Sequence, residues 1–207
     1  MIAFDTPFLN KGDRLVVLGD SITANPGGYI RMLTGRLAGR GIEVVNAGRG
    51  GEKTPWALTR LVPDVIEREP DAVAVFLGTN DSMIGRQKWA DEPKVNVRTY
   101  ADNLAWIVYL CRGQGIERFS IVTPFARPEG KVWHEFGDVM KPYALAAREV
   151  AGDLPVPVVP LDVAFEQAWA SRPGHDGLLL TRDGIHPNDR GQSLIVETMM
   201  SAWRLAD

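Results

Sequence analysis

Short apolar runs alternate with longer segments of helical periodicity along the 207 residues, and this alternation constrains the fold more than any other feature. Apolar runs joined by helical crossovers are typical of parallel strands, because a tight turn cannot connect a parallel pair. The expected strands are the run from Arg14 that stops on Gly19-Asp20-Ser21, then Ile42–Asn46, Ala72–Leu77, Phe119–Thr123 and Val156–Leu161. The pattern predicts a single α/β domain over residues 1–207, with a parallel sheet whose strands are covered on both faces.

The segments between these strands carry helix signals at their ends. Helices are expected near Tyr29–Arg40 with Gly41 as the C-cap, from the N-cap Thr54 with Pro55 first in the helix, over Tyr100–Arg112, near Val139–Ala151, near Val163–Ser171 and from Asp189 to Arg204. Pro63 should kink or split the second of them, because proline lacks the amide hydrogen that a helix needs. Two long segments that follow strands, Ser82–Asn96 and Pro124–Gly137, are expected to form loops at the carboxyl edge of the sheet, where pockets form.

Composition excludes several classes of protein. The chain has 23 Lys and Arg against 26 Asp and Glu, a net charge of −3, which argues against nucleic acid as a partner. Its single cysteine, Cys111, lies in an apolar periodic segment and is expected to be a small core residue. The N-terminus lacks the basic and apolar regions of a signal peptide, and no run of about 18 apolar residues follows, so a soluble, cytoplasmic protein without a membrane partner is expected. The oligomeric state stays open.

Ser21 is the first candidate for chemistry, because it stands where the first strand ends. A rigid strand delivers its hydroxyl to the carboxyl edge of the sheet, where ligands bind in open α/β folds. A serine hydroxyl becomes a good nucleophile only when a neighbouring base takes its proton. Taken alone, Gly19-Asp20-Ser21 is equally compatible with an ordinary turn in which the serine caps a helix.

The stretch Asp183-Gly-Ile-His186 can supply that base. A carboxylate that accepts a hydrogen bond from one ring nitrogen fixes the tautomer of a histidine and leaves the other nitrogen free to accept a proton. The alternative is a surface loop with a helix-capping aspartate. A metal site needs more ligands than this pair, and the three histidines of the chain form no metal-binding motif, so no metal and no other cofactor are expected.

Two further stretches can supply hydrogen-bond donors to a developing negative charge. Asn46-Ala-Gly-Arg-Gly-Gly51 can expose backbone amides because glycine has no Cβ, and Asn80 in Gly78-Thr-Asn-Asp81 ends the most apolar strand. A flexible connection and a turn residue are the respective alternatives. The glycine spacing matches neither common phosphate-binding loop.

Together these four stretches resemble the SGNH, or GDSL-type, hydrolase superfamily, in their order and over nearly the whole chain. The resemblance implies a three-layer α/β/α sandwich with a flavodoxin-like five-stranded parallel sheet. Asn80-Asp81 and Tyr100-Ala-Asp-Asn-Leu104 also look like the isoamyl acetate-hydrolysing esterase subgroup. The first stretch departs from the family's older name, with Ile22 in place of leucine. The α/β-hydrolase family fits poorly, because the chain has no Gly-x-Ser-x-Gly motif.

The resemblance also implies the roles of the site residues. Ser21 would be the nucleophile, His186 the general base and acid, and Asp183 the residue that orients His186. The backbone amides of Ser21 and Gly51 and the side chain of Asn80 would form the oxyanion hole. Gly48 and Gly50 stay alternatives to Gly51.

The substrate implied is a small-molecule ester, and its identity stays open. Candidate pocket residues are Asp20, Trp89, Phe125 and Trp133, although the aromatic ones are equally compatible with loop anchors. A short-chain carboxylesterase is favoured. The alternatives are a deacetylase of acetylated carbohydrates, a lysophospholipase or thioesterase and, outside enzymes, a non-catalytic sugar-ester binding module.

Overall fold

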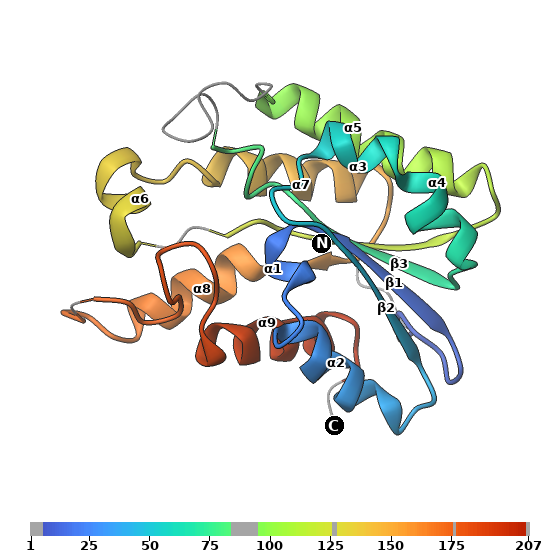
Figure 1. The fold of residues 1–207 in the computed structure, drawn as a ribbon, viewed down its shortest axis with the longest axis horizontal. Coiled ribbons are helices and arrows are strands. Elements are labelled where there is room, and N and C mark those ends of the chain that lie inside the picture. The colour runs from blue at the N-terminus through green and yellow to red at the C-terminus, as the bar shows by residue number, and fades with distance from the viewer. Residues whose placement is uncertain (1–5, 84–94, 126–127, 176, 206–207) are drawn as a thin grey trace.

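The computed structural model describes residues 6–83, 95–125, 128–175 and 177–205 (Figure 1). These residues form a parallel sheet in the order β2-β1-β3-β4-β5. Its strands are β1 (Arg14–Gly19), β2 (Glu43–Gly48), β3 (Ala72–Phe76), β4 (Arg118–Val122) and β5 (Val158–Val159). The predicted α/β class and the flavodoxin-like order are confirmed. In this order the crossovers change direction between β1 and β3, which is where doubly wound sheets bind ligands.

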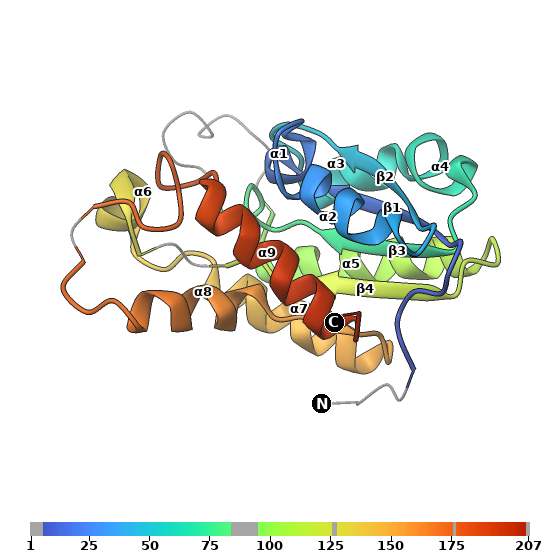
Figure 2. The same ribbon diagram turned by 90° about the horizontal axis from the view of Figure 1, so that it is seen from below.

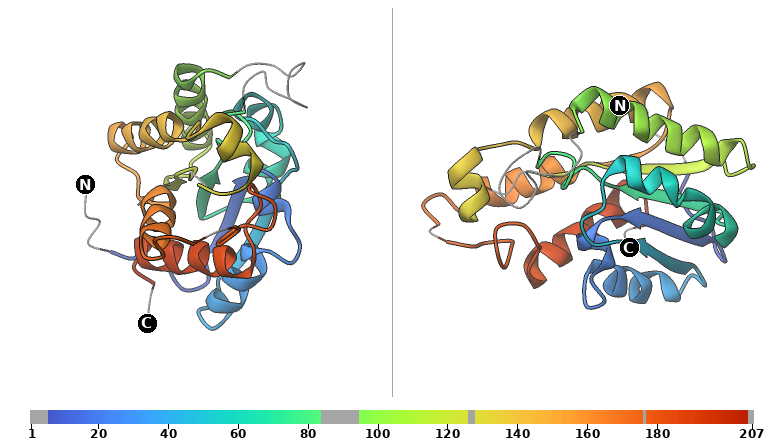
Figure 3. Two further views of the ribbon diagram at one scale, coloured as in Figure 1. Left: turned by 90° about the vertical axis from the view of Figure 1, so that its left-hand side faces the viewer. Right: turned by 45° about the horizontal axis from the view of Figure 1, so that its top comes forward.

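Helices cover both faces of the sheet, as Figures 1 and 2 show. One face carries α3 (Thr54–Thr59), α4 (Leu61–Asp64), the 3₁₀ turn η1 (Ile66–Arg68), α5 (Val97–Arg112) and α7 (Lys141–Asp153). The other carries α2 (Tyr29–Ala38), α8 (Leu161–Ala170) and α9 (Asp189–Ala202). The short helices α1 (Ser21–Ala24) and α6 (Gly130–Phe136) follow the carboxyl ends of their strands, α1 near the middle of Figure 1 and α6 on its left. The end-on view in Figure 3 shows the resulting three layers.

The continuous apolar run of β1 is explained by burial on both faces. Val16 and Leu18 pack into the core beneath α3, α5 and α7, whereas Leu15 and Val17 pack into the core beneath α2, α8 and α9. All four side chains are fully buried. A central parallel strand therefore cannot show the alternation of polar and apolar residues that marks a half-exposed strand.

Several predicted boundaries shift in the structure. The helix expected from Thr54 is split as predicted, because α3 ends at Thr59 and α4 begins at Leu61, ahead of Pro63. Lys53, and not Thr54, is its N-cap. The last strand is shorter than expected, since β5 holds only two residues.

The long loop predicted after β4 is wrong in part, because α6 occupies its second half. The loop predicted over Ser82–Asn96 lies mostly outside the described residues. Cys111 is buried among apolar side chains of α5 and its neighbours, as predicted, and burial raises the pKa of its thiol to about 11. Within the ranges that the structure describes, no helix has the length and apolar character needed to cross a membrane.

Candidate active site

Ser21 is the first residue of α1, directly after the end of β1. The carboxylate of Asp20 accepts a hydrogen bond from the backbone N–H of Ile22 at 2.9 Å and so caps this short helix. The backbones at the end of the strand pack too closely for side chains. A Cβ on Gly19 would lie 2.1 Å from Thr23 Oγ1, and one on Gly48 would lie 2.3 Å from the backbone nitrogen of Ala24. Two glycines therefore let α1 sit directly on the ends of β1 and β2.

A tight loop before α9 brings Asp183 and His186 to the same edge. Thr181 and Pro187 form an antiparallel bridge at its base, and the backbone N–H of Arg182 donates to the carbonyl of His186 at 2.9 Å. Asn188 caps α9 through Gly191 N–H, and its side-chain amide also donates to the carbonyls of Leu179 and Thr181. The cap that starts the helix thus also holds the loop closed.

Ser21, His186 and Asp183 form an unbroken chain of hydrogen bonds. Ser21 Oγ lies 3.0 Å from His186 Nε2, and His186 Nδ1 lies 2.7 Å from Asp183 Oδ2. Because a carboxylate can only accept, the ring proton resides on Nδ1, which leaves the lone pair of Nε2 facing the serine hydroxyl. The structure thus brings together the three residues that the sequence singled out.

The carboxylate of Asp183 is held in its ionised form. Partial burial alone would raise its pKa, but hydrogen bonds from the backbone N–H of His186, from the His186 ring and from the N–H of Ile185 outweigh burial. The pKa of Asp183 therefore lies below its ordinary value. A carboxylate that stays charged at neutral pH can stabilise an imidazolium on its partner.

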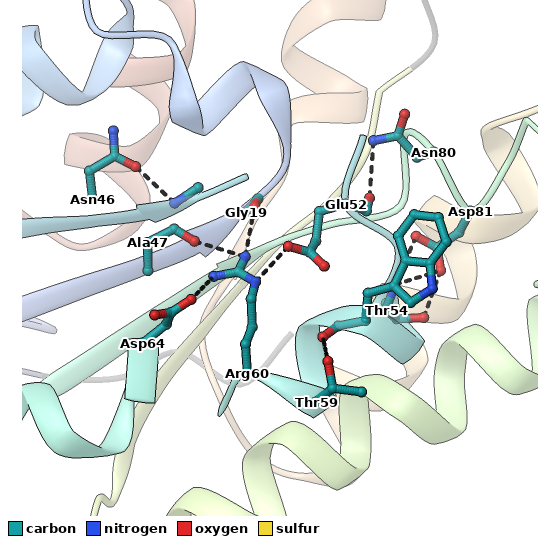
Figure 4. Close-up of polar contacts among 12 residues, drawn as sticks. Gly19, Asn46, Ala47, Glu52, Thr54, Thr59, Arg60, Asp64, Asn80 and Asp81 are labelled. Atoms are coloured by element: carbon teal, nitrogen blue, oxygen red, sulfur yellow. Dashed lines mark hydrogen bonds and ion pairs between the residues drawn. The ribbon is translucent and has the colours of Figure 1, made fainter. Parts of the chain in front are cut away.

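A glycine turn that follows β2 and the side chain of Asn80, which follows β3, contact each other at the carboxyl edge of the sheet. Arg49 to Glu52 form a turn closed by the Glu52 N–H on the Arg49 carbonyl at 3.2 Å, with Gly51 at φ +75° in its third position. That position of such a turn demands a positive φ, and glycine adopts it without strain. Asn80 is 6% exposed, and its Nδ2 donates to the carbonyl of Glu52 at 3.0 Å (Figure 4). The second N–H of that amide is a donor that this bond does not use.

Asp81 joins the same two segments from behind. Its carboxylate accepts hydrogen bonds from Thr54 N at 3.0 Å and from Thr54 Oγ1 at 2.6 Å (Figure 4). Burial raises the pKa of Asp81 to about 6, although the bonds from Thr54 oppose the shift. Two sets of hydrogen bonds, Asn80 with Glu52 and Asp81 with Thr54, therefore hold the segments 52–54 and 80–81 together.

A cavity of about 460 Å³ lies next to Asp183. Its wall comes from the start of α6, the end of α8 and the loop that leads to Asp183, and includes Lys131, His134, Trp169 and His175. The rings of Trp169 and His175 lie 5.7 Å apart. No sequence pattern indicates this cavity, because its walls come from segments that are far apart in the chain.

Glu129 and Gly130 line this cavity and contact the segment that carries Asp183. The buried carboxylate of Glu129 accepts the backbone N–H groups of Leu179 at 2.6 Å and Leu180 at 3.2 Å. A Cβ on Gly130 would lie 2.6 Å from Gly184 Cα, so the two backbones touch. These contacts position the loop that carries Asp183. Glu129 appears in the sequence only as a charge in a predicted loop, and no local pattern marks it.

The four residues predicted to line a substrate pocket lie in different environments. Phe125 is 1% exposed and stacks on Phe165 with ring centroids 3.7 Å apart, so it is a core residue and not a pocket wall. Asp20 is likewise 1% exposed and caps α1, which corrects its assignment to the pocket. Trp133 lies half-buried on α6. Trp89 lies outside the described residues.

Among the residues whose placement the structure describes, no group of three or more His, Cys, Asp or Glu side chains is arranged to hold a metal ion. The chemistry available at this edge of the sheet is that of a serine, an imidazole, a carboxylate and backbone and amide donors. A flavodoxin-like sheet with this set at its carboxyl edge defines the class of serine hydrolases that act on esters.

The chain belongs to the GDSL-like lipase/acylhydrolase family, whose model matches residues 17–194. It is 25% identical to the acetylxylan esterase of Geobacillus stearothermophilus, over 93% of this chain and 94% of that enzyme. The crystal structure of an acetyl xylan esterase, AlAXEase, superposes with a TM-score of 0.79 at 26% identity and covers 91% of this chain and 98% of its own. The lipoprotein YqeF of Bacillus subtilis is 31% identical over 83 residues, which are 40% of this chain and only 33% of that protein.

Proposed function

We propose that the protein hydrolyses short-chain acyl esters, foremost acetyl esters, by two-step acyl transfer through Ser21. The observation that carries the proposal is the continuous hydrogen-bonded chain from Ser21 Oγ through His186 to Asp183. The names of two relatives, both acetylxylan esterases, support the acetyl group as the acyl moiety.

In the first step, Ser21 Oγ attacks the ester carbonyl while His186 Nε2 takes its proton. The tetrahedral intermediate collapses, the alcohol leaves with the proton from His186, and the acyl group remains on Ser21. A water molecule then gives its proton to His186 and attacks the acyl-enzyme. The acid leaves, and Ser21 regains its proton. Asp183 stabilises the imidazolium that forms in each step.

The oxyanion of each tetrahedral intermediate needs donors that are in place before the reaction. We assign this role to the backbone N–H groups of Ser21 and Gly51 and to the N–H of Asn80 that does not bind Glu52. Gly51 is favoured over Gly50 and Gly48 because it has a positive φ in the Arg49–Glu52 turn, directly before the residue whose carbonyl binds Asn80. A single donor of this kind contributes about 10²–10³ in rate.

The cavity beside Asp183 favours a carbohydrate as the alcohol part of the ester. It is lined by polar side chains and by the indole of Trp169, and a sugar ring presents both hydroxyls for hydrogen bonding and an apolar face for stacking. Acetylated carbohydrates are therefore our second, more specific candidate. A non-catalytic sugar-binding module would have no need for the hydrogen bonds between Ser21, His186 and Asp183.

A cytoplasmic location is also proposed. It depends on the use of a single, buried cysteine, which suits a reducing compartment. The alignment with the lipoprotein YqeF covers only a third of that protein, so it does not extend the location of YqeF to this protein.

The proposal is tested by initial rates on p-nitrophenyl acetate for the wild type and Ser21→Ala. We expect the mutant to fall to the uncatalysed rate, because the nucleophile is removed. Ser201→Ala, at an exposed serine on the last turn of α9, is the matched control and should keep the wild-type rate. Intact-mass measurement after rapid quenching should find an added acetyl group on wild type only. A wild-type rate no higher than that of Ser21→Ala would refute the esterase proposal.

A further inference from the structure

Arg60 is a buried cation that touches the ends of two strands. It stands between α3 and α4 and is 6% exposed. Its Nη2 donates to the carbonyl of Ala47 in β2 at 3.0 Å and to the carbonyl of Gly19, the last residue of β1, at 3.4 Å (Figure 4). The guanidinium therefore ties together the strand that leads to Ser21 and the strand that leads to the glycine turn.

The same guanidinium holds the side chain of Glu52. Arg60 Nε donates to Glu52 Oε2 at 2.5 Å, and both side chains are almost wholly buried, at 7% and 0% exposure. Glu52 Oε1 is buried and has no hydrogen-bond partner within the described ranges, so the ion pair with Arg60 is what fixes this carboxylate. Arg60 Nη1 completes the set by donating to Asp64 Oδ2 at 2.8 Å.

Glu52 is also the residue that links the glycine turn to Asn80. Its backbone N–H closes the turn that contains Gly51, and its backbone carbonyl accepts the Asn80 amide at 3.0 Å. One residue thus has its side chain clamped by Arg60 and its main chain shared by two of the groups that we assign to the oxyanion hole. Figure 4 shows the contacts that lead from Arg60 through Glu52 to Asn80.

We propose that Arg60 and Glu52 form a positioning pair for the oxyanion hole, setting the place of Gly51 and Asn80 relative to Ser21. The inference rests on the proposed esterase function of Ser21. Neither residue contacts the substrate in this scheme, because both are buried behind the turn. Their effect on the reaction arises because donors must stand within about half an ångström of the productive geometry.

Arginine is the residue type best suited to bind these two carbonyls and two carboxylates together. A planar guanidinium presents donors in a fixed fork and can reach two carbonyls and two carboxylates at once, whereas a lysine ammonium is a single point at the end of a flexible stem. Arg60→Lys should therefore keep the positive charge beside Glu52 and lose the geometry. Glu52→Gln keeps an acceptor for Arg60 Nε and loses the charge.

The first measurement is kcat and KM on p-nitrophenyl acetate. We expect Arg60→Lys to lower kcat about tenfold or more with KM within about twofold of wild type, since the donors matter most in the transition state. Glu52→Gln should retain more of kcat than Glu52→Ala, because an amide oxygen still accepts from Arg60. The control is Arg118→Lys, since Arg118 pairs with Asp13 at the opposite edge of the sheet. That variant should lose thermal stability and keep its kcat.

A double-mutant cycle separates positioning from general destabilisation. Asn80→Ala removes one of the two donors that the pair positions, together with its bond to Glu52, so that only Gly51 remains for Arg60 to position. The kcat loss from Arg60→Lys should then be several-fold smaller in the Asn80→Ala background than in the wild type, because the effects of coupled residues are not additive. Losses that multiply in the double mutant, or a folded Arg60→Lys variant with wild-type kcat, would overturn the proposal. So would a failure of both Arg60→Lys and Glu52→Gln to fold by circular dichroism, since the pair would then serve stability alone.

The esterase proposal can fail independently of this one. An inactive wild type refutes the function of Ser21, whereas an active wild type with an unchanged or merely additive Arg60→Lys variant refutes the positioning role only.

Discussion

The carboxyl group of Asp81, the residue after Asn80, is fully buried. Burial raises its pKa to about 6, from an ordinary value of 3.8. An acid whose pKa is raised by folding binds its proton more tightly in the folded state than in the unfolded chain. Between these two pKa values, folding therefore becomes less favourable as the pH rises. Above about pH 6 the full cost of burying the charged carboxylate is present.

Asp81→Asn should reveal this cost, because an amide of the same shape does not titrate. From pH 4 to pH 7, we expect the free energy of unfolding of the wild type to fall relative to Asp81→Asn by about 3 kcal/mol, which corresponds to about two pKa units. Urea unfolding at four pH values in this range measures it. The control is Asp153→Asn at the exposed end of α7, whose curve should run parallel to that of the wild type. If the free energy of unfolding of Asp81→Asn also ran parallel to that of the wild type from pH 4 to pH 7, the raised pKa of Asp81 would be contradicted.

The residues that the sequence could identify are those with a short local signature. Ser21, Asp183 and His186 stand in tripeptides and tetrapeptides whose chemistry can be inferred from the residue types alone, and the structure brings the three side chains together. Glu52 and Arg60 carry no such signature, since a charged residue next to a glycine turn or in a helix normally lies in solvent. Only the fold shows that both are buried.

At the scale of elements, α9 has to approach the loop of Asp183 and His186 closely. Gly191, in its first turn, makes this contact possible, because a Cβ there would lie 2.2 Å from the carbonyl oxygen of Leu180 and 3.0 Å from Pro187 Cβ. The same turn donates the Gly191 N–H to the cap Asn188. The helix start and the loop are therefore packed as one unit, and the position of His186 depends on both.

Gly191→Ala should disturb this unit. We expect a loss of about 1–3 kcal/mol of unfolding free energy, the usual cost of overpacking, together with a fall in kcat as His186 moves relative to Ser21. The matched control is Gly35→Ala on the exposed face of α2, where nothing lies within 4 Å of the added Cβ. That variant should gain about 0.5–1 kcal/mol, because alanine is the better helix former. Chemical denaturation and esterase rates of both variants check the prediction, which fails if Gly191→Ala matches Gly35→Ala in both.

The elements themselves were predictable wherever the hydrophobic pattern was long. The four longer strands and α5 follow from apolar runs and helical periodicity, and the split before Pro63 follows from proline chemistry. The structure differs at short elements. The seven-residue α6 begins at Gly130, whose φ of +73° serves its contact with Gly184 and gives no local helix signal. Two residues suffice for β5 because β4 alone holds this edge strand.

At the scale of the whole molecule, the cavity next to Asp183 joins parts of the chain that no local pattern relates. α6 follows β4, Trp169 lies in the last turn of α8, and His175 and Leu178 precede the loop of Asp183. All three segments meet at the carboxyl edge because parallel strands place the connections that follow them on the same side of the sheet. The topology could be predicted, but the side chains that meet there could not.

If the alcohol part of the proposed substrate occupies this cavity, it contacts other residues than the acyl group does, and the two parts should respond to different mutations. If a sugar occupies the cavity, Trp169→Ala removes a stacking surface that contributes about 1 kcal/mol or more. We expect kcat/KM for an acetylated xyloside to fall about five- to tenfold. The rate on p-nitrophenyl acetate, whose smaller alcohol makes less use of the cavity, should change less than twofold.

Trp106→Ala serves as the matched control, because this tryptophan is 56% exposed on α5, on the opposite face of the sheet from α8. The Trp106→Ala variant should keep the wild-type rates on both substrates. Equal losses on the two substrates for Trp169→Ala would mean that the indole supports the loop of Asp183 and not the sugar. No loss on either would remove the cavity from substrate binding, and the carbohydrate candidate would then give way to simple short-chain esters.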